Sequence, residues 1–95
     1  MHVRVVRFTD VNQERMEELV RRLRDSDGPP PGIPVKGLSI CFDSDQSTAV
    51  VLQYFETADD LEEGAKVLGQ MDASETPGRR ASVDACEVKL ELSPS

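Results

Sequence analysis

The chain has 95 residues, of which 11 are Lys or Arg and 18 are Asp or Glu, so its formal net charge is -7. This length fits a single domain over residues 1–95, and a hydrophobic content of 38% is too high for a disordered chain. The acidic balance disfavours nucleic acid as a partner, because a phosphate backbone is bound by a basic surface. No apolar run approaches the about 20 residues of a membrane span, and the N-terminal residues lack a secretion signal. We therefore expect a cytoplasmic protein that binds neither nucleic acid nor membrane.

The first periodic pattern covers residues 2–8, where apolar side chains alternate in a way that predicts a strand. Val3 and Val5 fall on one face of this strand, and Val6 and Phe8 on the other. Asp10 and Gln13 have the spacing of a capping box, so we expect a helix to begin there. Its apolar stripe has the i, i+3, i+4, i+7 spacing of an amphipathic helix and consists of Met16, Leu19, Val20 and Leu23.

A proline-rich stretch at residues 29–34 follows, which predicts a stiff connector rather than a proline-motif ligand. Two strands are predicted next, over residues 35–42 and 48–55, and the polar residues 43–47 between them are typical of a hairpin turn. The second of these strands is apolar on both faces.

The second helix is expected to start at Thr57, which with Asp60 forms an N-terminal capping pattern. The residues predicted to face inward on this helix are Ala58, Leu61, Ala65, Leu68 and Met71. A last strand is predicted over residues 81–92. One of its faces carries an apolar row made of Cys86, Val88, Leu90 and Leu92.

The predicted order β-α-β-β-α-β is that of the ferredoxin-like α+β fold, a four-stranded antiparallel sheet with both helices on one face. The other face then has no cover from this chain. Because apolar residues occupy that face as well, we expect a homodimer in which two sheets pack face to face.

Residues with obvious chemistry are few. Cys41 and Cys86 are not spaced as zinc ligands, and His2 is the only histidine, so the cysteines are expected to be buried, free thiols. Asp43 and Asp45 resemble the start of a calcium loop but lack its glycine and its final glutamate. We therefore expect no metal site and no cofactor, and the catalytic residues, if any, are unknown.

The most informative polar residues interrupt otherwise apolar strands. Arg7, Gln53 and Tyr54 are the candidate ligand-binding residues, since such groups can orient a small, partly polar aromatic molecule. Cross-strand pairing, for example of Arg7 with Glu87, is the structural alternative, and we favour it.

The element order and the stretch from Gly37 to Leu61 are similar to the dimeric α/β-barrel superfamily, which includes antibiotic-biosynthesis monooxygenase-like domains. The Asp-rich hairpin and the junction Tyr-Phe-Glu-Thr-Ala-Asp-Asp-Leu at residues 54–61 carry this resemblance. Members of the superfamily often hold a ligand between sheet and helices or inside the barrel, and some oxygenate aromatic polyketides without a cofactor. This chain departs from those enzymes in having no tryptophan, with Phe55 near the expected place.

Two functions follow. The first is a homodimeric α/β-barrel protein that binds a small apolar or aromatic ligand without a visible catalytic constellation. The alternative, which rests on the resemblance, is a cofactor-free monooxygenase-like enzyme for an aromatic or polyketide-type substrate.

Overall fold

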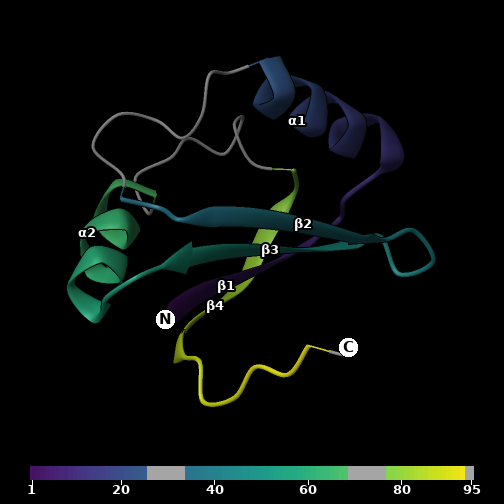
Figure 1. Cartoon of the computed structure of the whole chain (residues 1–95). Helices are drawn as coiled ribbons and strands as arrows, with labels where there is room; N and C mark the ends of the chain where they lie inside the picture. Colours follow the sequence, from purple (N-terminus) through teal and green to yellow (C-terminus); the bar gives the residue numbers. More distant parts are fainter. Residues whose placement is uncertain (26–33, 69–76, 94–95) are drawn as a thin grey trace.

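A computed structural model describes residues 1–25, 34–68 and 77–93 of the chain (Figure 1). Its elements are β1 (His2–Thr9), α1 (Gln13–Asp25), β2 (Gly37–Asp43), β3 (Thr48–Phe55), α2 (Ala58–Leu68) and β4 (Arg79–Glu87). This order confirms the predicted ferredoxin-like α+β fold. Within the described ranges, neither helix has the length and apolar character needed to cross a lipid bilayer. Apart from Pro34, the predicted proline-rich connector lies outside the described residues.

The strands form one antiparallel sheet in the order β2-β3-β1-β4, so β1 is hydrogen-bonded along both of its edges. Val6 of β1, for example, lies opposite Val51 of β3 and opposite Val83 of β4. The same order places Cys41 on one edge strand and Cys86 on the other, and both are free cysteines. The prediction that the two thiols are buried is wrong, because both residues are exposed.

Side chains directly opposite one another in an antiparallel sheet lie on the same face, so the register divides the sheet into two surfaces. The helix-covered face carries alternate residues of each strand: His2, Arg4, Val6, Phe8, Leu38, Ile40, Phe42, Ala49, Val51, Gln53, Phe55, Val83, Ala85 and Glu87. The helix-free face carries Val3, Val5, Arg7, Ser39, Cys41, Val50, Leu52, Tyr54, Ser82, Asp84 and Cys86. In Figure 1, α1 lies above the sheet and the segment that follows β4 runs below it.

The core lies between the helices and the sheet as two apolar clusters. The first cluster is formed by Val6, Phe8, Val11, Met16, Ala49 and Val51, with Val20, Ile40 and Phe42 packed against it. The second is formed by Phe55 and Leu61, with Val35 and Leu68 packed against it. Two predictions for the helices are wrong. Leu23, expected in the apolar stripe of α1, and Ala58, expected to face inward on α2, are exposed, since each lies at an end of its helix. Met71 lies outside the described residues.

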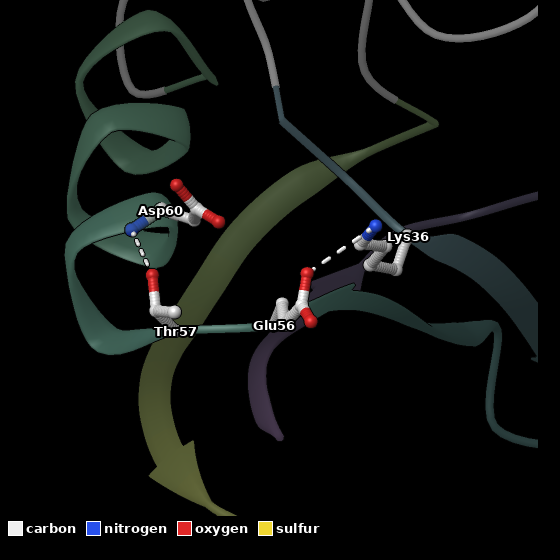
Figure 2. A network of polar contacts seen from close by, with 4 residues as sticks. All are labelled: Lys36, Glu56, Thr57 and Asp60. Atoms are coloured by element: carbon white, nitrogen blue, oxygen red, sulfur yellow. Dashed lines mark hydrogen bonds and ion pairs between the residues drawn. The ribbon is translucent and has the colours of Figure 1, made fainter.

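The two helices begin with side-chain caps. The Thr57 hydroxyl accepts a hydrogen bond of 3.1 Å from the backbone N–H of Asp60, which confirms the predicted cap of α2 (Figure 2). The exposed pair of Lys36 and Glu56, 3.3 Å apart, lies just before it and contributes little to stability.

The predicted cap of α1 is wrong by two residues. The Asn12 side chain accepts a hydrogen bond of 2.7 Å from the backbone N–H of Arg15, so Asn12 rather than Asp10 is the N-cap. Asp10 has a φ of 57° and turns the chain from β1 toward the helix, a conformation that aspartate tolerates better than most residues.

The last strand is shorter than predicted. It ends at Glu87, which lies opposite His2, the first residue of β1. One more hydrogen bond follows, from the backbone N–H of Val88 to the Met1 carbonyl. Leu90 and Leu92, expected in the strand, lie beyond it and are 73% and 82% exposed.

Gly78, just before β4, packs closely against the chain that leaves β1. A Cβ atom there would overlap the Thr9 carbonyl oxygen and lie 2.8 Å from Cγ2 of Val11. We expect Gly78→Ala to lower the free energy of unfolding by about 1–3 kcal/mol, the usual range for overpacking, in urea denaturation. The control is Gly37→Ala, where the added methyl would lie 3.6 Å from the Tyr54 ring, an ordinary contact. Equal losses in both variants would contradict this account.

The N-cap of α1 gives a second prediction. Asn12→Ala removes the acceptor for the Arg15 N–H and should lower the free energy of unfolding by about 1 kcal/mol. Asn12→Asp retains a side-chain oxygen and should leave stability nearly unchanged. A full loss in the Asp variant, measured by the same urea titration, would show that Asn12 acts in another way.

Candidate functional site

The side chain that stands out on the helix-covered face is Arg4 of β1. It is 5% exposed, although arginine is almost never fully buried without a partner. Its Nη1 donates a hydrogen bond of 2.9 Å to Oε1 of Gln53 on the neighbouring strand β3. Its Nε is buried and has no hydrogen-bond partner among the described residues. The guanidinium thus has a hydrogen-bond partner at Nη1 and none at Nε.

Arg4 also lacks a counter-ion in the part of the chain that the structure describes. The ion pairs there join Lys36 to Glu56 and Lys89 to Glu87. Glu87 lies on the same sheet face as Arg4, one pair further along the strand, yet its carboxylate binds Lys89 at 3.2 Å. A buried charge without a partner is costly, so this arrangement needs an explanation beyond packing.

A second positive charge, that of Arg80, lies near Arg4. Burial lowers the pKa of Arg4 below its usual range, and the nearby positive charge of Arg80 lowers the pKa further. Arg80 lies in β4 opposite Phe8, on the helix-covered face. Arginine keeps its proton in proteins, so both side chains stay cationic. A locally positive point therefore exists within a chain whose net charge is -7.

The register places Arg4 at the boundary between the two core clusters. Arg4 and Gln53 form one cross-strand pair, with Val6 and Val51 of the first cluster on one side and Phe55 of the second cluster on the other. We call Arg4 and Gln53 the polar pair. The polar pair lies on the helix-covered face between the two apolar clusters.

The helices leave the β4 side of this surface uncovered. Ala85, opposite Arg4, and Val83, opposite Val6, share the helix-covered face but are exposed, Val83 to 43%. A molecule on this side would meet apolar side chains next to the polar pair and Arg80. The β4 side therefore presents exposed apolar side chains next to the polar pair.

The structure separates the three residues predicted to bind a ligand. Gln53 lies on the helix-covered face, whereas Arg7 and Tyr54 lie on the helix-free face. On that face Arg7 is opposite Val50 and Tyr54 is opposite Val3, so one pair of this face, Val5 with Leu52, lies between them. The suggested pairing of Arg7 with Glu87 is wrong, because the register sets Ser82 opposite Arg7.

Arg7 borders a shallow hollow on the helix-free face near the β2–β3 hairpin. The hollow has a volume of about 210 Å³ and is lined by Arg7, Cys41, Phe42, Asp43, Gln46, Thr48 and Val50. It is open to solvent and contains no buried, unpartnered polar group among the residues described. Arg7 therefore stays a candidate, but the hollow gives no sign of a dedicated ligand.

Sequence reasoning missed Arg4. Its signal was present, because Arg4 has the same parity as Val6 and Phe8, and an arginine in phase with two core residues is unusual. The sequence could not show which parity faces the helices. In the described ranges, no group of three or more His, Cys, Asp or Glu side chains is placed to hold a metal ion.

The chain shares its fold with a mycobacterial protein. Among solved structures it is similar to Rv0793 from Mycobacterium tuberculosis, with a TM-score of 0.56 over 98% of this chain and 100% of that one. The two sequences are 13% identical, so the likeness concerns the fold alone. No protein-family model and no curated protein matches the sequence.

We expect the free energy of unfolding to rise when the polar pair is replaced by apolar side chains. The double variant Arg4→Met and Gln53→Met fills the same space with apolar side chains and should raise the free energy of unfolding by about 1–4 kcal/mol. Arg4→Met alone should gain less, because it leaves the half-buried Gln53 amide without its partner. Urea denaturation checks both values, and a double variant less stable than the parent chain would show that the pair is structural.

Proposed function

We propose that this protein is a homodimeric α/β barrel that binds a small, partly apolar molecule on the helix-covered face of each sheet. The observation that carries the binding function is the buried Arg4 guanidinium, which has a neutral partner on one edge and none at Nε. Natural proteins retain such unfavourable groups where function requires them. The exposed Val83 and Ala85 beside it supply the apolar part of the site.

The helix-free face supports the dimer. Its central residues are apolar and are not covered by a helix: Val3, Val5, Val50, Leu52 and Tyr54. The segment after β4 runs on the same side of the sheet and carries the exposed Leu90 and Leu92 (Figure 1). A second copy is the occupant that covers this face in both chains at once, because a two-fold interface is self-complementary.

We also propose that the chain is related to the antibiotic-biosynthesis monooxygenase-like domains. The ferredoxin-like fold and the likeness to Rv0793 are compatible with it at the level of fold. The separation of Gln53 from Tyr54 and Arg7 weakens the enzyme alternative, since the residues suggested for it do not line one site. We therefore propose ligand binding rather than oxygenation.

The dimer is tested by native mass spectrometry of the purified chain. Val5→Glu places a charge at the centre of the helix-free face, opposite Leu52, and should convert the dimer to a monomer at micromolar concentration. Val67→Glu is the matched control, because Val67 is 45% exposed on α2, and it should remain dimeric. A monomeric parent chain would refute the dimer.

The same spectra test the binding function. A dimer whose mass exceeds twice that of the chain, and whose additional mass is lost on denaturation, would reveal a molecule retained during purification. If only the bare mass is found, the function depends on the titrations described below, and failure of every probe there would contradict it.

A further inference from the structure

The edge of the Arg4 guanidinium that has no partner defines what it can bind. Arginine presents its donors in a rigid, planar fork. Nη1 is occupied by Gln53, and the opposite edge is formed by Nε and Nη2. Two parallel N–H donors at this spacing match the two oxygens of a carboxylate.

The charges around Arg4 favour an anionic ligand over a neutral one. Gln53 is neutral, so it satisfies a donor without cancelling the positive charge. Arg80 adds a second cation close enough to lower the pKa of Arg4. A neutral carbonyl would satisfy Nε but would leave both charges uncompensated, whereas an anion satisfies the donor and offsets the charge.

The surroundings define the rest of the ligand. Val83 and Ala85 lie on the same face as Arg4 along the uncovered β4 side, and Val83 is 43% exposed. An apolar body placed there would bury side chains that otherwise face water. The site therefore combines an anion anchor with an adjacent apolar surface.

Building on the proposed function, we propose that the ligand is an organic carboxylate with an apolar body, held by the Nε and Nη2 edge of Arg4 with Arg80 nearby. The apolar body lies against Val83 and Ala85. The carboxylate is a bound group and not a reactant, so this assignment requires no chemical step.

The test compares two probes that have the same shape and differ in charge. 2-Naphthoate and 2-naphthamide are titrated into the 95-residue protein by isothermal calorimetry at neutral pH, with inorganic phosphate as a third probe. We expect naphthoate to bind about 10-fold or more tightly than naphthamide, because hydrogen bonds between ionised groups are the stronger ones. The net charge of -7 would repel an anion, so overall electrostatics cannot produce this preference.

Two variants connect the preference to Arg4. Gln53→Glu supplies a carboxylate to Nη1 from within the chain, keeps the shape of the side chain and should reduce the advantage of naphthoate by about 10-fold. Arg4→Met should remove the advantage altogether. Arg22→Met in α1 makes the same change of charge at an exposed position and should leave both affinities unaltered. Retained folding is checked by circular dichroism for each variant.

Each alternative outcome is informative. Equal binding of the two naphthalene probes would overturn the carboxylate assignment and leave the proposed binding function intact. A preference for phosphate over naphthoate would also overturn it, and would identify an inorganic anion site. If no probe binds, the assignment fails, and a buried water molecule at Nε becomes the explanation for the Arg4 guanidinium.

Discussion

The two-residue period of β1 is the constraint on which the rest of the structure depends. β1 pairs with β3 on one edge and with β4 on the other, so its alternation decides which side chains of both neighbours face the helices. Val6 and Phe8 must lie under α1 for the first core cluster to form. The same period then places Arg4 on that face, and a shift that exposed Arg4 would expose Val6 as well.

Burial of Arg4 is therefore a property of the strand as a whole and not of one side chain. The chain accommodates it with a neutral partner, Gln53, at the matching position of β3. A carboxylate at that position would pair with the charge permanently. An amide leaves the Arg4 charge uncompensated. This lowers the stability of the ligand-free protein and favours the binding of an anionic ligand. The identity of one residue on β3 thus distinguishes a structural ion pair from a binding site.

Periodicity and capping patterns were sufficient to predict the order of the elements and the cap at Thr57. They failed where the outcome depends on tertiary register. The last strand was extended to residue 92 because its apolar alternation continues, but pairing stops where β1 begins. Asp10 was chosen as the cap because its side chain suits that role, although its backbone is used for the turn.

The candidate site was harder to predict than the fold, for a physical reason. Arg7, Gln53 and Tyr54 were selected because they are polar within apolar strands, and only Gln53 lies next to the buried guanidinium. Adjacent residues such as Gln53 and Tyr54 must point to opposite faces of a sheet. Which face carries a site depends on where the helices pack, and spacing along one strand does not contain that information.

The pairing of the first strand with the last has a consequence for how the chain folds. The β2–β3 hairpin joins neighbours in sequence, with Asp43 opposite Thr48, whereas β1 and β4 join residues as distant as His2 and Glu87. Contacts between distant residues close large loops, which slows folding. The hairpin can therefore form early, and Arg4 loses water on its β4 side when the last strand docks. Amide hydrogen exchange along β4 would then report how often the native sheet opens at the edge that borders the polar pair.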